Sequence, residues 1–257
     1  MYSKNLSFVV QGPIIDKDNC TIRCLSSIRK YFPQSEIILS TWPNYDVKNI
    51  SYDKLVVSYN DPGDHYMNLN RQIITTQRGL EKASNDTSIK IRTDIIFSND
   101  NILQYYGKWN IKNIMPVFDD IIMVSNMQTI DPENNVEMKS WHRCFNPSDW
   151  AIMGATSDLG FLFDIPLIDN SVEFTISPEQ YIWLHTIQKK YPEIKLKNMT
   201  EVNSDLIEKT LIFYACNLTI LNIYSQFGIY SEKYKYQNEL DNHFMQHQKW
   251  LDYREKL

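Results

Sequence analysis

The stretch IKIRTDIIF, residues 89–97, decides the fold class of this chain. Its run of β-branched residues predicts a strand that is buried on both faces, as the strands of a parallel sheet are. Ligands of open α/β sheets bind beyond the carboxyl ends of the strands. Arg92 and Asp94 come at that end, so the pattern favours a site for a charged, phosphorylated ligand. A surface ion pair that caps the strand is the structural alternative.

Composition limits the class of protein. Hydrophobic residues make up 43% of the 257 residues and charged residues 22%, as in ordinary soluble globular domains. The formal net charge of −5 offers no basic surface, so no nucleic-acid partner is expected. The seven glycines form neither GxGxxG nor GxxxxGKS/T, which disfavours the dinucleotide-binding and P-loop classes.

The N-terminal segment and the cysteines indicate a cytoplasmic protein. The first residues lead into a short strand without the apolar core of a signal peptide, and no apolar run reaches the roughly 18 residues that span a bilayer. The cysteines include one close pair and no second pair that would complete a zinc site. We therefore expect free thiols at Cys20, Cys24, Cys144 and Cys216.

Strand and helix patterns alternate through the first half of the chain. Runs of β-branched residues predict strands, and apolar residues three or four apart predict helices between them. The predicted strands cover residues 7–10, 36–41, 54–58 and 89–97, and the predicted helices cover residues 18–31 and 68–83. This alternation predicts an α/β fold with a mostly parallel sheet and right-handed connections.

The second half of the chain is less regular. Its patterns are a strand at 121–124, a polar loop at 131–147, a short apolar run at 150–153, helices at 158–163 and 177–190, and a terminal surface helix within 232–257. No repeat and no low-complexity linker interrupts the sequence. One domain over residues 1–257 is therefore expected.

Four loops follow predicted parallel strands and therefore fall at one edge of the sheet. They are Gln11-Gly12-Pro13, Thr41-Trp42, Asn60-Asp61-Pro62-Gly63 and Arg92-Thr93-Asp94. Gly12 permits a close approach to the backbone, and Asp61 offers hydrogen bonds to a ribose or a base. Each loop also has a purely turn-forming interpretation, and it is their convergence that favours a ligand-binding crevice.

The helix predicted to begin at residue 68 presents its positive N-terminal end to the same crevice. Asn70 and Arg71 lie in its first turn, where an arginine clamps a phosphate with two hydrogen bonds; a solvent-facing arginine is the alternative. Asp94 is a candidate ligand for Mg²⁺ or Mn²⁺, which need only one or two carboxylates when phosphates fill other positions. Arg92 is the other source of positive charge for a diphosphate.

Two carboxylates are candidates for a general base. Glu179 belongs to the sequence SPEQ, which matches a capping box and places this residue in the first turn of a helix. A charge that complements the helix dipole is its structural alternative. Asp149 is the competing base, with a turn or helix-capping role as its alternative. His243 and His247 are four residues apart on the predicted tail helix, but without HExxH we favour a docking helix over a metal site.

An ordered set of motifs resembles a known family. The motifs are VVQGP (9–13), SIRKYFP (27–33), EIILSTW (36–42), NRQ (70–72), KIRTD (90–94), PSDW (147–150) and PEQY (178–181). Together they look like a nucleotide-sugar glycosyltransferase of the GT-A fold. More specifically, they resemble the bacterial WavE-type lipopolysaccharide synthesis family, over most of the chain and in the same order.

The resemblance implies a GT-A-like, Rossmann-type sheet flanked by helices, with an irregular C-terminal acceptor lobe. Residues 1–125 would bind the nucleotide sugar, and residues 126–257 would bind the acceptor and supply the terminal helix. The implied reaction moves a sugar to a lipopolysaccharide core or capsule acceptor with inversion. Enzymes of this fold generally use Asp-x-Asp to bind a metal-diphosphate, whereas this chain has Arg92-Thr93-Asp94, so a divalent cation would depend on Asp94 alone. Glu179 matches the place of the base and is preferred to Asp149.

The implied donor site gathers residues from the four loops and the helix: Gln11, Gly12, Pro13, Thr41, Asp61, Asn70, Arg71, Arg92 and Asp94. The implied acceptor is an oligosaccharide or a lipid-linked glycan, with Trp141, His142 and Arg143 as its contacts or as a lid. Membrane contact at the inner face is peripheral at most. The alternatives are a sugar-phosphate nucleotidyltransferase, which lacks its Gly-rich basic loop here, and a catalytically inactive glycan-binding protein of the same fold.

Overall fold

A mixed sheet organises the molecule. The computed structural model describes residues 5–63, 65–133, 143–169, 175–234 and 243–257. Seven strands lie in the order β3-β2-β1-β4-β7-β6-β8. Their bounds are β1 Leu6–Gln11, β2 Glu36–Thr41, β3 Lys54–Val57, β4 Thr87–Arg92, β6 Ile122–Ser125, β7 Ala151–Ala155 and β8 Leu218–Leu221. Every neighbouring pair is parallel except the two that involve β7, so the predicted α/β class with a mostly parallel sheet is confirmed.

The first half of the chain winds in two directions from β1. Helix α1 (Cys20–Tyr31) leads to β2 on one side of β1, and helix α2 (His65–Leu80) leads to β4 on the other side. Gln11, at the end of β1, and Arg92, at the end of β4, are partners in the ladder. The carboxyl ends of these two strands therefore form a topological switch point, which is where ligands of open α/β sheets bind.

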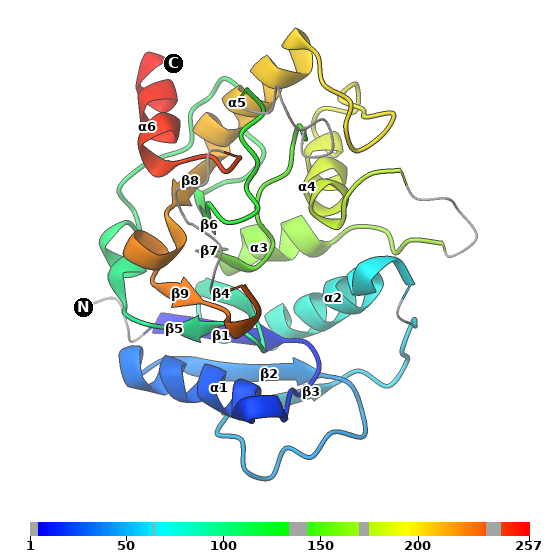
Figure 1. Ribbon diagram of the computed structural model, residues 1–257, viewed down its shortest axis with the longest axis vertical. Helices are drawn as coiled ribbons and strands as arrows, with labels where there is room; N and C mark the ends of the chain where they lie inside the picture. The colour runs from blue at the N-terminus through cyan, green and yellow to red at the C-terminus, as the bar shows by residue number, and fades with distance from the viewer. Residues whose placement is uncertain (1–4, 64, 134–142, 170–174, 235–242) are drawn as a thin grey trace.

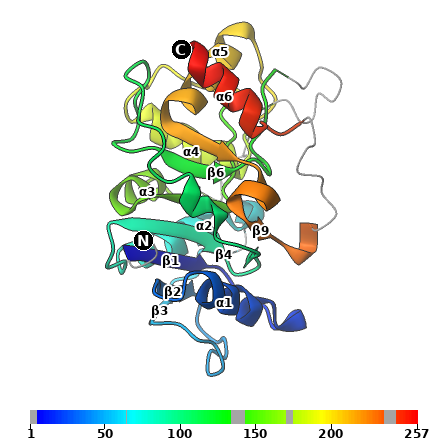
Figure 2. The ribbon, with the colours of Figure 1, turned by 90° about the vertical axis from the view of Figure 1, so that its left-hand side faces the viewer.

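Alternate residues of the central strands supply two cores. Phe8 of β1 and Ile89 of β4 belong to the core that α1 covers, whereas Val9 belongs to the core that α2 covers. Figure 2 shows α1 and β9 on one side of the sheet and α3 and α4 on the other. The sheet is covered on both faces, which explains why its strands are near-continuous apolar runs.

Two predicted boundaries are wrong. The strand predicted for residues 89–97 ends at Arg92, because the N–H of Ile95 turns back to the carbonyl of Arg92 at 3.2 Å. Residues Ile96–Phe97 form a separate strand, β5, which pairs with β9 (Ile229–Tyr230). Helix α2 ends at Leu80 rather than residue 83 and opens with three residues of left-handed backbone, Tyr66–Asn68.

The second half is more regular than the sequence predicts. It contains α3 (Thr156–Phe163), α4 (Pro178–Gln188), α5 (Ser204–Asn217), a π-helical turn (Ile223–Phe227) and α6 (His247–Lys256). The sequence patterns predict neither α5 nor β8. Most of the residues in the second half of α5 are buried, so this helix lacks the polar stripe that makes an amphipathic helix visible in a sequence.

The terminal helix is shorter and more deeply packed than predicted. Only α6 of the predicted segment 232–257 is an α-helix among the described residues, and Trp250 is 1% exposed. The guanidinium of Arg254 donates to the carbonyls of Ala215 and Asn110. The predicted same-face pair of histidines is wrong, because His243 precedes the helix and His247 begins it.

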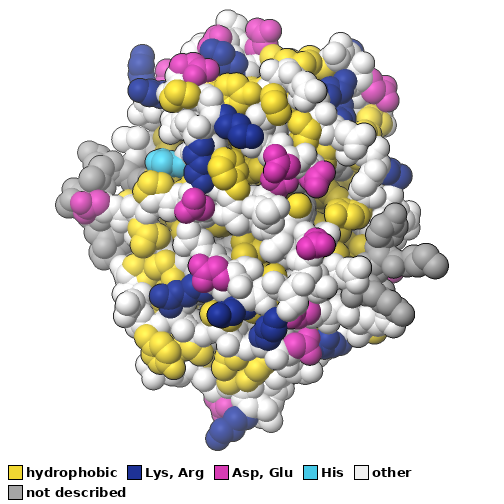
Figure 3. All heavy atoms as spheres, turned by 180° about the vertical axis from the view of Figure 1, so that it is seen from behind, with side chains coloured by type: hydrophobic (Ala, Val, Ile, Leu, Met, Phe, Trp, Pro, Cys, Tyr) yellow, Lys and Arg dark blue, Asp and Glu magenta, His cyan; other side chains and the backbone are white. Residues whose placement is uncertain are grey.

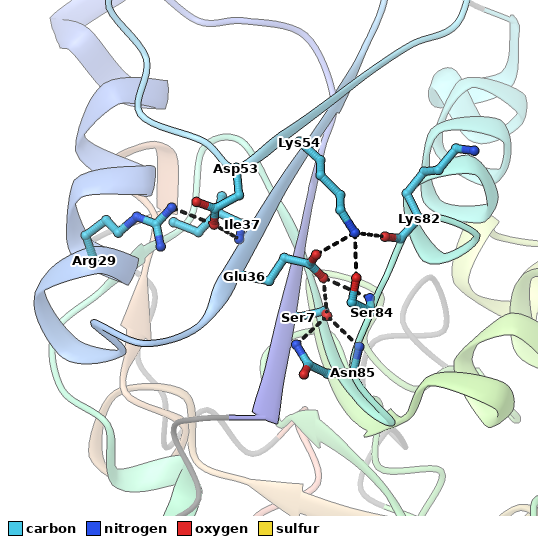
Figure 4. Close-up of polar contacts among 9 residues, drawn as sticks. All are labelled: Ser7, Arg29, Glu36, Ile37, Asp53, Lys54, Lys82, Ser84 and Asn85. Carbon is cyan, nitrogen blue, oxygen red and sulfur yellow. Dashed lines mark hydrogen bonds and ion pairs between the residues drawn. The ribbon is translucent and has the colours of Figure 1, made fainter.

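A polar network ties together the amino ends of the strands, opposite the switch point (Figure 4). The carboxylate of Glu36 accepts hydrogen bonds from the Ser7 hydroxyl at 2.6 Å and the Ser84 N–H at 2.9 Å, and it pairs with Lys54 at 2.6 Å. Burial opposes the charge of Glu36, but these three partners outweigh burial and lower its pKa to about 2. The network thus fixes the starts of β1, β2 and β3 relative to one another.

The face seen from behind Figure 1 carries basic and acidic side chains interspersed with hydrophobic ones (Figure 3). Within the described residues, no helix combines the length and the apolar character needed to cross a membrane.

Candidate active site

A cavity of about 320 Å³ is lined from four directions. Arg92 reaches it from the end of β4, Gln72 from α2, Asp149 from the segment before β7, and Glu179 from the start of α4. The segment before β7 arrives here because β7 runs antiparallel to β4 and therefore begins where β4 ends. The cavity thus lies at the carboxyl edge of the parallel strands, as predicted.

Two arginines, Arg92 and Arg143, line this cavity, and Arg92 is held by a neighbouring carboxylate. The Nε and Nη2 of Arg92 donate to the two carboxylate oxygens of Asp94 at 2.9 and 2.5 Å. The guanidinium also lies over the ring of Trp150, 5.5 Å from its centre. The side chain of Arg92 remains 28% exposed, whereas that of Asp94 is 12% exposed. Asp94 therefore orients Arg92, which presents its charge to the cavity.

Glu179 is held by the predicted capping box, which is confirmed. The Ser177 hydroxyl accepts the N–H of Gln180 at 3.1 Å, and the Gln180 side chain accepts the N–H of Ser177 at 3.0 Å. Ser177 also donates to the side-chain oxygen of Asn146 at 2.6 Å, which joins the start of α4 to the segment before β7.

The surroundings of Glu179 change its acidity. Burial and then the negative charge of Asp149 raise the pKa of Glu179 to about 7, against the opposing effects of its own backbone N–H, Arg143 and Ser177. A carboxylate with a pKa close to neutral pH is suited to accept a proton and to release it again.

Asp149 is fixed more firmly than Glu179. One of its carboxylate oxygens accepts a hydrogen bond of 2.6 Å from the Gln72 side chain, and its backbone carbonyl accepts one from Lys90. The side chain is buried, with 6% of the residue exposed. The structure therefore brings both predicted base candidates into one cavity with Arg92.

The predicted loop after β1 braces the switch point. The side-chain oxygen of Gln11 accepts a hydrogen bond from Thr75 at 3.0 Å, and the hydroxyl of Thr93 donates to the carbonyl of Pro13 at 2.7 Å. Gly12 has a φ of +128°, and a Cβ there would lie 3.1 Å from the Thr93 hydroxyl. Gln11, Gly12 and Pro13 thus lie beside Arg92 and Asp94 but do not line the cavity.

Other predicted donor residues lie away from the cavity. Arg71 makes two hydrogen bonds to the carboxylate of Asp61, at 2.7 and 2.6 Å, near the surface. Asn70 is buried, and its amide both donates to and accepts from the backbone of Ile168. Thr41 is buried at the end of β2. On α2 it is Gln72 that faces the cavity, because each residue of a helix turns by about 100°.

Several lining residues were not predicted. They are Tyr66, Met67, Gln72, Gln128, Trp150 and Met199, with Lys90 directly beneath the cavity. Trp150 belongs to the motif PSDW (147–150), where an aromatic side chain next to the candidate base Asp149 could have marked it as a lining residue. Of the three residues predicted to contact the acceptor, Arg143 lines the cavity, while Trp141 and His142 lie outside the described residues.

A second cavity, also of about 320 Å³, lies beyond the ends of β1 and β2. Asp16, Asn19 and Thr21 line it from the segment after β1, and Asp46 and Asn49 line it from the segment after β2. Next to Asn19 and Thr21, burial and then the charge of Asp94 raise the pKa of Cys20. Asp94 is therefore near Cys20, which follows Asn19 at the second cavity.

Asp94 is bound by Arg92 and does not itself line the cavity. Each of its carboxylate oxygens accepts one hydrogen bond from Arg92 and keeps a second lone pair, so a divalent cation at Asp94 stays a prediction. Over the part of the chain that the structure describes, no three His, Cys, Asp or Glu side chains come together as metal ligands.

A family model identifies the family of this chain. The family model described as WavE lipopolysaccharide synthesis matches residues 6–256. Among solved structures, the crystal structure of the glycosyltransferase GlyE from Streptococcus pneumoniae TIGR4 is similar, with a TM-score of 0.39 and 9% sequence identity. The match covers 87% of this chain and 46% of that one, so this chain spans less than half the length of that structure. The search of curated proteins returned no match.

Proposed function

The chain belongs to the WavE lipopolysaccharide synthesis family, and from this premise we propose that it is an enzyme that transfers a sugar from a nucleotide-sugar donor to a bacterial surface glycan. The observation that carries the proposal is the meeting of Glu179, Asp149 and Arg92 in one cavity at the switch point of the sheet. Glycosyl transfer needs a base for the acceptor hydroxyl and a positive charge for the departing diphosphate. The cavity offers both.

The proposed reaction is a single in-line displacement at the anomeric carbon. The acceptor oxygen forms a bond to that carbon while the bond to the diphosphate oxygen breaks and its electron pair leaves with the diphosphate. Glu179 takes the proton of the acceptor hydroxyl, and the Arg92 guanidinium offsets the charge that develops on the leaving group. A single displacement inverts the configuration of the sugar.

Asp149 has a different role in this scheme. The side chain of Asp149 is held by the hydrogen bond from Gln72, and the residue is buried beside the cavity. Burial and then the negative charge of Asp149 raise the pKa of Glu179 to about 7, which suits Glu179 to the exchange of a proton near neutral pH. Glu179 is therefore preferred as the base, and Asp149 is the group that adjusts it.

The donor would extend over both cavities. Its diphosphate lies at the Arg92–Asp94 pair, its sugar in the cavity with Glu179, and its nucleoside in the cavity beyond β1 and β2. Asp46 and Asn49 there offer hydrogen bonds to a ribose or a base. No step of this scheme is assigned to a divalent cation; the Arg92 guanidinium, which Asp94 orients, supplies the positive charge.

Calorimetric titration with a panel of nucleotides and nucleotide sugars tests this function, with EDTA or with Mn²⁺ present. We expect a nucleoside diphosphate and its sugar conjugate to bind in EDTA, and the conjugate to be hydrolysed slowly. Binding of a nucleoside triphosphate with a sugar phosphate would instead identify a nucleotidyltransferase. A chain that binds none of these but binds oligosaccharide would be a glycan-binding protein without catalysis.

A further inference from the structure

Lys90 is a buried cation between apolar neighbours on the face of the sheet that α2 covers. It occupies the middle of β4, and its exposed fraction is 0%. Its ladder partners, Val9 of β1 and Ile152 of β7, are core residues, and the ring of Phe163 lies 5.6 Å from its ammonium nitrogen. A methionine or leucine would fill this space without the cost of burying a charge.

The ammonium group of Lys90 points to the candidate active site. It donates a hydrogen bond to the backbone carbonyl of Asp149, the residue that carries one of the two carboxylates into the cavity. Arg92, two residues further along the same strand, lines that cavity. The buried ammonium group of Lys90 thus contacts the segment that carries Asp149 into the cavity.

Charged groups surround Lys90 on several elements. Asp149 before β7, Asp94 after β4 and Glu179 on α4 favour its charge, whereas Arg92 on β4 opposes it. Burial dominates and lowers the pKa of Lys90 to about 8. Electrostatic interactions are mutual, so a protonated Lys90 favours the ionised form of Glu179 in return.

We propose that Lys90 is a positioning residue of the active site. Its ammonium group holds the Asp149 segment against the sheet and keeps Glu179 ionised when the acceptor hydroxyl arrives. This inference rests on the proposed function, because it assigns Lys90 a role in the action of Glu179 as a base. Lys90 itself touches no substrate.

The pH dependence of donor hydrolysis, measured with the nucleotide sugar that the titration panel identifies, tests this role. For the wild-type protein we expect the rate to rise with pH near 7, as Glu179 ionises, and to stay level at alkaline pH. In Lys90→Met the rising limb moves up by about one pH unit. The value of kcat at pH 7 then drops about fivefold, because one pKa unit corresponds to a tenfold change in the ratio of the two forms. KM stays nearly constant.

Two further variants separate charge from packing. Lys189→Met is the matched control, since Lys189 also lies against an aromatic ring, that of Phe161, and donates to a backbone carbonyl, but on the outer end of α4. It should leave the pH profile unchanged. Lys90→Arg keeps the charge at all pH values, so its rising limb stays near pH 7.

Thermal unfolding from pH 5 to 10 checks the charge of Lys90 without any substrate. The folded pKa lies below the ordinary value of 10.5, so the unfolded chain binds more protons between about 8 and 10.5. The wild type therefore gains stability relative to Lys90→Met as pH rises through that window. A gain that is already complete below pH 7 would mean that Lys90 is neutral when the enzyme works, and would overturn the proposal.

The outcomes distinguish this proposal from the proposed function. If the wild type hydrolyses no nucleotide sugar, both fail. If the wild type is active and Lys90→Met has the same pH profile as Lys189→Met, only the role of Lys90 fails. Should Lys90→Met not fold, a rising limb of Lys90→Arg that is displaced from that of the wild type would overturn the role by itself.

Discussion

At the scale of single residues, chemistry in this molecule depends on what surrounds each carboxylate. Glu179 and Asp149 line the same cavity, but only Asp149 receives a side-chain hydrogen bond from Gln72. Burial and the charge of Asp149 leave Glu179 with a pKa of about 7. The two carboxylates therefore have different tasks although they share one site.

Replacing Glu179 with Gln should reduce kcat by about 100- to 10,000-fold, because general-base catalysis contributes that much to typical reactions. The residual rate should no longer rise with pH through 7. Stopped assays of donor consumption at several pH values measure both effects. Glu208→Gln, on the exposed face of α5, is the control and should retain wild-type turnover. Equal rates for the two variants would exclude Glu179 as the base.

Replacing Arg92 with Lys should weaken the binding of a nucleoside diphosphate about 10- to 100-fold, because an ammonium group cannot make the paired hydrogen bonds of a guanidinium. Calorimetric titration measures the change. Arg29→Lys is the control. Arg29 lies on α1, outside both cavities, and its guanidinium also pairs with an aspartate, Asp53, at 2.6 Å. An Arg92→Lys protein that binds as well as Arg29→Lys would place the diphosphate elsewhere.

Sequence patterns predict the residues of this site that local motifs mark, but not the residues that are placed by contacts distant in the sequence. Arg92 follows a visible strand, and Glu179 belongs to a local capping box, so both can be found from their neighbours in the chain. Lys90 and Gln72 cannot, because their roles depend on Asp149, which is 59 and 77 residues away. Arg71 was predicted in place of Gln72 because the rotation of α2 relative to the sheet is not visible in the sequence.

At the scale of elements, the packing of α2 on the sheet sets where Gln72 lies. Gly79 makes this packing close: a Cβ there would lie 2.3 Å from a methyl group of Val9 and 3.3 Å from the Cβ of Ser40. The helix therefore cannot approach β1 this closely with any other residue at position 79.

Gly79→Ala should lower the free energy of unfolding by about 1–3 kcal/mol, since the added methyl overpacks a full interface. Gly160→Ala is the matched control in α3, where a Cβ meets nothing within 4 Å. That change should raise the free energy of unfolding by about 0.5–1 kcal/mol through helix propensity. Urea denaturation of both proteins measures the difference. A Gly79→Ala protein as stable as Gly160→Ala would contradict the close approach of α2 to β1.

The network around Glu36 holds together the amino ends of β1, β2 and β3 and makes the free energy of unfolding depend on pH. The folded pKa of about 2 lies below the ordinary value of 4.5, so the contribution of Glu36 is complete above about 4.5 and is lost as pH falls toward 2. Glu36→Gln should cost about 2 kcal/mol at pH 7, because it weakens the bonds of a carboxylate that is only 14% exposed.

Thermal melts between pH 2 and 7 test this prediction. The difference in melting temperature between wild type and Glu36→Gln should shrink as pH falls through that window. A difference that does not change with pH would mean that the Glu36 carboxylate contributes nothing through its charge. Glu208→Gln again serves as the control and should show no difference at either end of the range.

At the scale of the whole molecule, the sheet crosses the boundary between the two halves of the chain. β4 from the first half pairs with β7 from the second, and Ile91 lies opposite Ala151 in that ladder. The parallel part could be predicted, because the alternation of strands and helices is a local pattern. The join could not, because antiparallel pairing of β7 depends on a contact between segments about 60 residues apart.

The accuracy of the predicted elements differs between the two halves of the chain. Strands β1, β2 and β3 were predicted nearly to the residue, since each is a short apolar run between clear turn signals. Helix α5 and strand β8 were missed, since they are packed on most sides and have neither a polar face nor a turn between them. Burial in a large core removes the periodicity on which such predictions depend.

The reversed direction of β7 has a consequence for how such chains diversify. The described residues of the connection between β6 and β7 belong to none of the seven strands, so insertions there would leave the register of the sheet intact. They would reshape the wall next to Glu179 while the end that holds Arg92 stays as it is. Relatives that decorate different glycans should therefore differ most in the length of this one connection, and exchanging it between them is a direct route to a changed acceptor.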